Sequence, residues 1–181
     1  NSMGGIYCND SGSVNEGYAY IMGSLVEMKL TESDKWLQGM LKNYPDMTAD
    51  EYLSNFSSSY GDDKYIPPVQ NPEYRLNDLG GVHYNAFLLV NIAREMNLTG
   101  GMSIEDEARL FTSTLSFMVS NVSYNTVEQF LILAAKLNHM DNYIPVLEGA
   151  FSKAGISAEM NKQSYLTTTK EGFGRVTVDM E

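Results

Sequence analysis

The sequence predicts a mainly α-helical fold, an antiparallel helical bundle with a short β-hairpin possible at its C-terminal end. Apolar residues recur three and four positions apart near the N-terminus and through most of residues 81–153, which is the spacing of amphipathic helices. Helix-start signals and glycine stops separate these segments. The connections from residue 96 onward are short, and short connections favour antiparallel neighbours.

The first predicted helix covers roughly residues 14–30, where Val14, Tyr18, Ile21 and Leu25 share one face. Residues 8–13 before it are rich in turn-forming types, so we expect a turn there. The region of about 31–78 is more polar and less regular. It predicts short helices joined by loops, with no clear domain boundary.

Four further helices are predicted from residue 81 onward. The first runs from about Gly81 to Met96 and stops near a glycine pair. The second opens with a capping box at Ser103 and continues to Met118. The third begins near Asn125, and the fourth covers about 141–153. These assignments give a domain of residues 1–156.

The last stretch, 157–181, changes character. Residues 165–169 and 175–178 are rich in Thr, Val and Tyr, with two glycines between the segments, which is typical of a hairpin. We interpret this stretch as an extension that either closes the helical domain or links it to an appended one.

The chain is acidic and carries few metal-binding side chains. Its 181 residues hold 12 Lys and Arg against 23 Asp and Glu, a formal net charge of −11. Nucleic acid and anionic membranes attract positive surfaces, so this balance argues against both as partners. One cysteine, Cys8, excludes an internal disulfide and a multi-cysteine zinc site. With only two histidines, His83 and His139, a His-rich metal site is excluded as well.

No apolar run approaches the roughly 20 residues that span a bilayer. The first residues also lack the basic and apolar regions of a signal peptide. The chain starts with Asn1 rather than an initiator methionine, which fits a piece of a longer product.

Two polar segments are candidates for chemistry. Glu16 is expected in the first turn of a helix, where a glutamate is usually solvated; facing a cleft, it could instead be one ligand of a zinc ion. Asp78 and His83 flank a glycine turn at the start of another helix. The ordinary interpretation is a capping Asp and a surface His. The alternative is an Asp–His pair that stabilises developing negative charge. Tyr7 carries no signal by itself.

Together these segments resemble the thermolysin-like neutral metalloproteases. Residues 5–16 and 21–27 are similar to the segment and helix that follow the family's first zinc helix. Residues 78–85 match its motif Asp-x-Gly-Gly-Val-His-x-Asn, and the final helices match through residue 156. The resemblance implies the family's α-helical C-terminal domain, over about residues 4–156.

The resemblance also implies roles for individual residues. Glu16 matches the carboxylate zinc ligand, and His83 the histidine that binds the oxyanion of the tetrahedral intermediate. Asp78 matches the acid that orients this histidine, and Tyr7 a tyrosine whose hydroxyl reaches the same oxyanion. The implied chemistry is zinc-assisted hydrolysis of peptide bonds by a secreted enzyme.

The chain departs from the family in its metal ligands. The helix with the His-Glu-x-x-His motif, which carries two zinc ligands and the catalytic base, is absent and is expected just upstream of Asn1. Tyr20 stands where the family usually has an Asp that supports a zinc-bound histidine. The acidic cluster that binds calcium is also incomplete: Glu27 matches it, but Lys35 and Leu37 occupy carboxylate positions. Calcium dependence therefore does not carry over.

Two functional hypotheses follow. In the first, the chain is the C-terminal half of a secreted zinc endopeptidase. It is inactive alone and is completed by the missing N-terminal half. In the second, it is a degenerate, non-catalytic domain that keeps the fold for binding or scaffolding. Tyr20 and the lack of a convincing substrate-binding arginine in the middle region favour the second modestly, because Arg75 lies too near Asp78.

Overall fold

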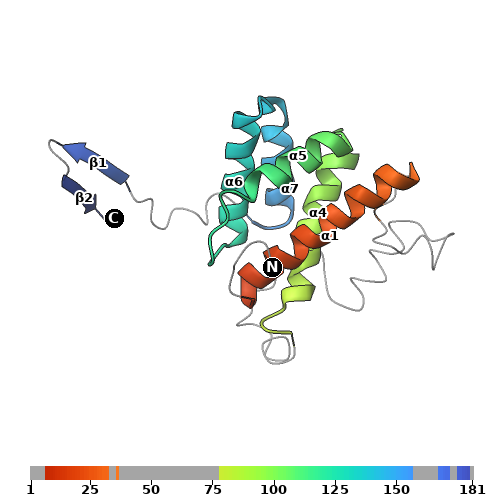
Figure 1. Cartoon of the computed structure of the whole chain (residues 1–181), viewed down its shortest axis with the longest axis horizontal. Helices are drawn as coiled ribbons and strands as arrows, with labels where there is room; N and C mark the ends of the chain where they lie inside the picture. The colour runs from red at the N-terminus through yellow and green to blue at the C-terminus, as the bar shows by residue number, and fades with distance from the viewer. Residues whose placement is uncertain (1–6, 33–35, 37–77, 157–166, 172–174, 180–181) are drawn as a thin grey trace.

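A computed structural model describes residues 7–32, 36, 78–156, 167–171 and 175–179. It is mainly helical, so the predicted fold class is confirmed (Figure 1). The short helices predicted within 31–78 lie outside the described residues. The elements in chain order are α1 (Asn9–Thr31), α4 (Val82–Leu98), α5 (Ile104–Thr114), α6 (Tyr124–Leu137), the 3₁₀ helix η3 (Asp141–Tyr143), α7 (Ile144–Lys153), β1 (Thr167–Glu171) and β2 (Arg175–Asp179).

Helix α1 begins at Asn9, five residues before the predicted start. The predicted turn at 8–13 is therefore wrong for most of its length. Ser11, Gly12 and Ser13 are buried, so these small residues serve the packing of the helix rather than a turn. As a result, Glu16 lies beyond the first turn of α1.

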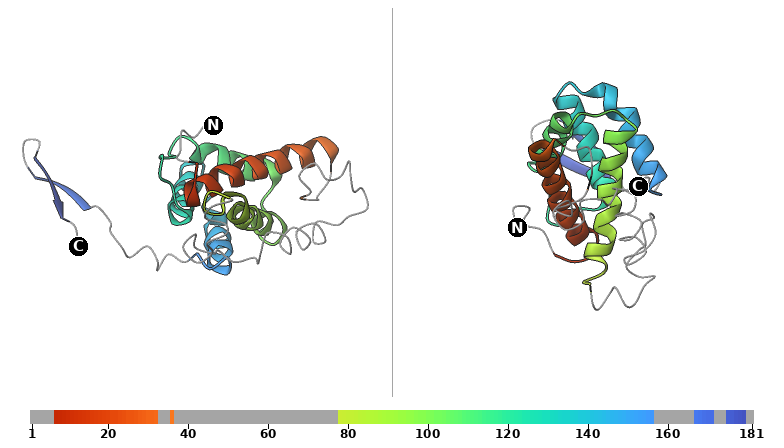
Figure 2. Two further views of the ribbon diagram at one scale, coloured as in Figure 1. Left: turned by 90° about the horizontal axis from the view of Figure 1, so that it is seen from below. Right: turned by 90° about the vertical axis from the view of Figure 1, so that its right-hand side faces the viewer.

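Helices α1 and α4 lie side by side and form the most extensive helix pair in the described chain (Figure 2). Two glycines of α1 permit their close approach. A Cβ atom on Gly17 would lie 3.1 Å from Cβ of Leu89, and one on Gly12 would lie 2.3 Å from Cγ1 of Val82. The close approach of α1 and α4 therefore depends on the absence of side chains at these positions.

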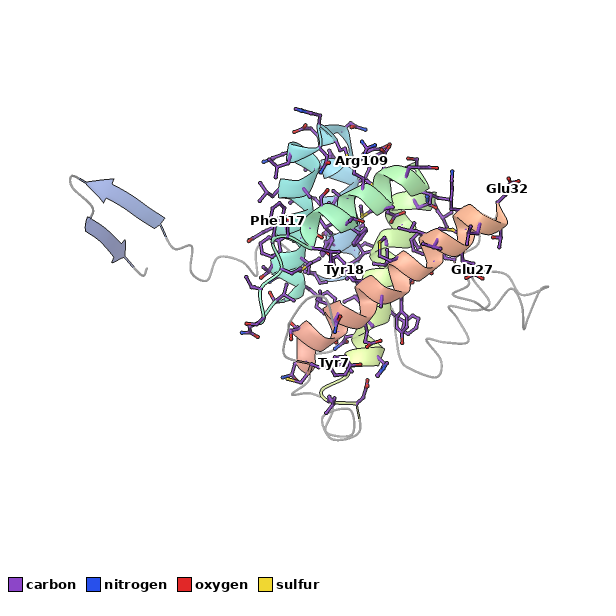
Figure 3. The ribbon with its side chains drawn as sticks, in the orientation of Figure 1. Tyr7, Tyr18, Glu27, Glu32, Arg109 and Phe117 are labelled. Carbon is purple, nitrogen blue, oxygen red and sulfur yellow. The ribbon has the colours of Figure 1, made fainter. Side chains whose placement is uncertain are left out.

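The remaining helices pack against this pair through an apolar core. Tyr18 of α1 reaches α5, where its hydroxyl lies 2.6 Å from Oγ1 of Thr114 and its ring meets Phe111 edge-on at 5.3 Å (Figure 3). The hydroxyl thus keeps a partner although the side chain is buried. Members of the core from all five α-helices include Val14, Ile21, Leu89, Ile92, Met96, Leu110, Phe111, Leu131 and Phe151.

The start of α5 follows the predicted capping chemistry. The Ser103 hydroxyl accepts a hydrogen bond from the Asp106 backbone N–H at 3.1 Å, as its capping box predicts. The end of α5 differs from prediction, because the helix stops at Thr114 and Met118 lies beyond it. The chain turns there and places Phe117 against Phe130 of α6, with ring centroids 6.0 Å apart.

The C-terminal stretch contains the hairpin suggested by its composition. Strands β1 and β2 are antiparallel, with Thr167 opposite Asp179 and Glu171 opposite Arg175. The division of the chain at residue 156 stays a prediction. In the described part of the chain, every helix is too short or too polar to cross a bilayer.

Replacing Gly12 with Ala should lower the free energy of unfolding by roughly 1–3 kcal/mol, because the new methyl group overlaps the buried Val82. The matched control is Gly23→Ala in the same helix, where no atom lies within 4 Å of the new Cβ. There the better helix propensity of Ala should raise stability by about 0.5–1 kcal/mol. Urea unfolding of both variants measures the difference, and equal effects would contradict the assigned packing.

Candidate functional site

Hydrogen bonds join the start of α1 to the turn that precedes α4. The Asn9 backbone N–H donates to the carbonyl oxygen of Leu79 at 2.8 Å. The buried Ser13 hydroxyl lies 3.2 Å from the carbonyl oxygen of Gly81 and 3.0 Å from that of Asn9. Gly80 has a φ of 93°, and a Cβ there would lie 2.0 Å from Oδ1 of Asn9. Only glycine therefore fits this turn.

Asp78 holds the first residues of α4 with both its backbone and its side chain. Its carbonyl oxygen accepts hydrogen bonds from the backbone N–H groups of Gly81 and Val82. Its Oδ2 accepts from the backbone N–H of His83 at 3.1 Å, and its Oδ1 lies 2.6 Å from the ring Nδ1 of His83. A carboxylate oxygen accepts, so Nδ1 is the donor and Nε2 remains for other contacts. Asp78 thus caps the helix and orients the imidazole, which unites the two interpretations of this pair.

Glu16 of α1 faces His83 across the junction of the two helices. Its Oε2 lies 3.9 Å from Nε2 of His83, and its Oε1 accepts a hydrogen bond from the Tyr7 hydroxyl at 2.6 Å. The Glu16 side chain is 22% exposed, so it is not the freely solvated first-turn glutamate of the ordinary interpretation. The structure therefore brings together all four residues singled out from the sequence, in the order Tyr7, Glu16, His83, Asp78.

The environment keeps the Tyr7 phenol protonated. Partial burial, followed by the hydrogen bond to Glu16 and the nearby negative charge, raises the pKa of Tyr7 well above its usual range. Tyr7 lies beside the start of α1, near the start of α4 (Figure 3). The hydroxyl is therefore available as a hydrogen-bond donor at any physiological pH.

The described residues supply one carboxylate but not a complete metal site. No three His, Cys, Asp or Glu side chains in the part of the chain shown by the structure lie close enough to hold a metal ion. Because a catalytic zinc takes three protein ligands, Glu16 can be at most one member of a larger set.

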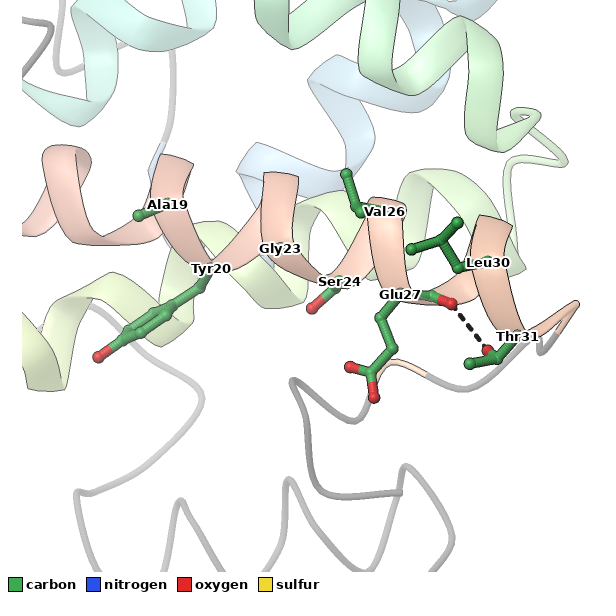
Figure 4. Close-up of a pocket in the computed structure, with 8 residues that line it drawn as sticks. All are labelled: Ala19, Tyr20, Gly23, Ser24, Val26, Glu27, Leu30 and Thr31. Carbon is green, nitrogen blue, oxygen red and sulfur yellow. Dashed lines mark hydrogen bonds between the residues drawn. The ribbon is translucent and has the colours of Figure 1, made fainter. Parts of the chain in front are cut away.

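A groove of about 500 Å³ runs along α1 one turn beyond Glu16 (Figure 4). Its lining is mostly apolar and consists of Ala19, Tyr20, Gly23, Ser24, Val26, Glu27, Leu30 and Thr31. The Tyr20 ring packs on Phe87 of α4 with centroids 5.3 Å apart. Phe87 is four residues after His83, as Tyr20 is four after Glu16, so an aromatic pair lies one turn beyond the Glu16–His83 pair on both helices.

Sequence reasoning missed the residues that hold the site together. Asn9 and Ser13 looked like turn residues, whereas their hydrogen bonds join α1 to the glycine turn. Their partners lie about 70 residues away along the chain, a contact that no local pattern could reveal.

Comparison with known proteins identifies the family of the helical part of the chain. The sequence model of the thermolysin metallopeptidase α-helical domain matches residues 5–156. The gelatinase of Enterococcus faecalis (strain ATCC 700802 / V583) is 24% identical over 165 residues, which cover 87% of this chain and 31% of the gelatinase. The chain thus spans about a third of the length of this curated relative. No solved structure matches.

Replacing Asp78 with Ala should lower the free energy of unfolding by about 1–2 kcal/mol, because α4 loses its side-chain cap and His83 loses its anchor. His83→Ala is the matched control, since it removes the ring but keeps the contact of Asp78 with the backbone N–H. Chemical denaturation should show a smaller loss for His83→Ala. A loss as large as that of Asp78→Ala would argue against the capping role.

Proposed function

Because the chain belongs to the thermolysin metallopeptidase family, as its α-helical domain, we propose that it is the C-terminal half of a secreted zinc endopeptidase that hydrolyses peptide bonds. The observation that carries the proposal is the continuous set of contacts from Tyr7 through Glu16 and His83 to Asp78. These residues come from three separate parts of the sequence. Their types suit the stabilisation of an oxyanion next to a metal.

Glu16 is the residue that would hold zinc. Its carboxylate is partly exposed, at the junction of α1 and α4, and lies beside a histidine nitrogen that stays open. The other two protein ligands would be supplied by a His-Glu-x-x-His helix in the rest of the parent protein. When bound, the metal would polarise the scissile carbonyl group and activate a water molecule.

His83 and Tyr7 would stabilise the charge that develops on the substrate carbonyl oxygen. The imidazole is fixed through Nδ1 by Asp78, so a proton on Nε2 can be donated to the oxyanion while the Asp78 carboxylate balances the positive ring. The Tyr7 hydroxyl donates to Glu16 in this structure. We expect it to turn to the oxyanion once Glu16 engages the metal.

A non-catalytic binding domain is the second candidate. Tyr20 favours it, because a phenol in place of the family's Asp lacks the carboxylate charge that would tune a metal-bound histidine. The sequence of the parent protein discriminates between the candidates. An intact His-Glu-x-x-His about ten residues before Asn1 would support the enzyme, and its absence would exclude it.

In the full-length parent, His83→Ala should lower kcat by about 10²–10³-fold, the typical loss for one oxyanion donor. Cleavage of casein or of a chromogenic peptide measures the rate, with loss of activity on adding a zinc chelator as the companion assay. Glu95→Gln is the control, because its carboxylate interacts with Lys153 and Thr99 rather than with the candidate site, and the rate should not change. An unaltered kcat for His83→Ala would refute the proposed role.

The 181-residue chain should not cleave casein, with or without added zinc, because its described residues provide only one of the required ligands. In the parent, Glu16→Gln should reduce the bound zinc that survives dialysis, since a neutral amide replaces a charged ligand. Atomic absorption measures the metal content. Full retention of zinc by Glu16→Gln would show that Glu16 is not a ligand.

A further inference from the structure

Two glutamates that are not part of the candidate site lie buried inside the helical domain. Glu107 of α5 is 0% exposed, and Glu128 of α6 is 3% exposed. Both carboxyl oxygens of Glu107, and Oε2 of Glu128, are buried without a hydrogen-bond partner. An ionised carboxylate in such a place would lose its hydration without compensation, which costs several kcal/mol in typical cases.

The surroundings of Glu107 are apolar. It shares the buried face of α5 with Leu110, Phe111 and Thr114. The Lys and Arg side chains on the helices packed against α5 are engaged elsewhere or exposed. Lys29 of α1 donates a hydrogen bond to Glu105, and Lys136 of α6 is exposed. The positive charge of Arg94 on α4 helps to lower the pKa of its neighbour Glu95. Burial alone therefore raises the pKa of Glu107 well above its usual value.

Glu128 faces a like charge rather than a cation. Burial and the negative charge of Glu148 on α7 raise the pKa of Glu128 to about 7. The other charged residues on the elements packed against α6 do not offset this. Arg109 of α5 and Asp141 of η3 are exposed, and Lys153 of α7 bonds Glu95.

We propose that the folded domain carries Glu107 and Glu128 as neutral carboxyl groups, so that mild acid stabilises the packing of α5 and α6 and alkaline pH loosens it. The two residues make the domain pH-sensitive independently of any peptidase activity. Helices α5 and α6 would then hold a switch that responds to the acidity of the surrounding medium.

The direction follows from the two protonation states. For both groups the folded state holds its proton more tightly than the unfolded state, in which a glutamate titrates near pH 4.5. The stability that they contribute is therefore complete below that pH. For Glu128 it is lost as the pH rises to about 7, and for Glu107 it is lost as the pH rises through its raised pKa.

The test is urea unfolding of the 181-residue chain and of Glu107→Gln and Glu128→Gln at pH 5 and pH 8. Glutamine keeps the shape of the side chain but cannot ionise. At each pH we compare the folding equilibrium constant of the variant with that of the unsubstituted chain. This ratio should be about tenfold or more higher at pH 8 than at pH 5, and tenfold corresponds to about 1.4 kcal/mol. An equal pH dependence in the variants and the unsubstituted chain would overturn the proposal.

Two controls separate burial from charge in general. Glu105 lies on the same helix as Glu107 but is exposed and bonded to Lys29. The Glu105→Gln variant should therefore show no such improvement in stability at pH 8. Glu148→Gln should give part of the Glu128 effect, because it removes the repelling charge. If the Gln variants do not fold, infrared spectra of the unsubstituted chain remain decisive. A protonated-carboxyl band should persist at pH 6.5, and its absence would overturn the proposal.

Discussion

The structure of the candidate site depends on the contact between the first turns of α1 and α4. The hydrogen bonds of Asn9 and Ser13 to the glycine turn fix the two helices at one end. The missing side chains of Gly12 and Gly17 then allow the helices to stay close over the following turns. Glu16 and His83 are carried on this rigid junction, so their separation is set by backbone packing rather than by their own attraction. An ion pair at 3.9 Å that is partly exposed is too weak to hold two helices together.

The two kinds of buried polar group in the domain contrast in their chemistry. At the junction, Ser13 and the partly buried Asp78 find backbone or side-chain partners. On α5 and α6, Glu107 and Glu128 have buried carboxyl oxygens without a hydrogen-bond partner. The hydrogen bonds of the first group fix the site and offset the desolvation of its polar atoms. Under our proposal, ionisation of the second group lowers stability, so that even a chain with a large apolar core depends on pH.

Local patterns in the sequence predicted much of the fold, because helix starts and stops are short-range features. The cap at Ser103 and the helix after Gly81 are examples. The start of α1 could not be predicted in this way. Ser11, Gly12 and Ser13 are typical turn residues, but here they lie in a helix and are buried. The end of α5 was missed for a similar reason, the contact of Phe117 with α6. Tyr7 became a candidate through family resemblance alone, because a single tyrosine carries no local signal, and for Glu16 the pattern left a solvated glutamate as the ordinary interpretation.

The bond between Ser13 and Gly81 joins positions 68 residues apart. The entropy of closing a loop grows only with the logarithm of its length, so doubling the connecting segment would cost about 0.6 kcal/mol. The geometry of the junction is therefore nearly indifferent to how many residues join α1 to α4. A connection of a different length would therefore leave the relative placement of Glu16 and His83 largely unchanged.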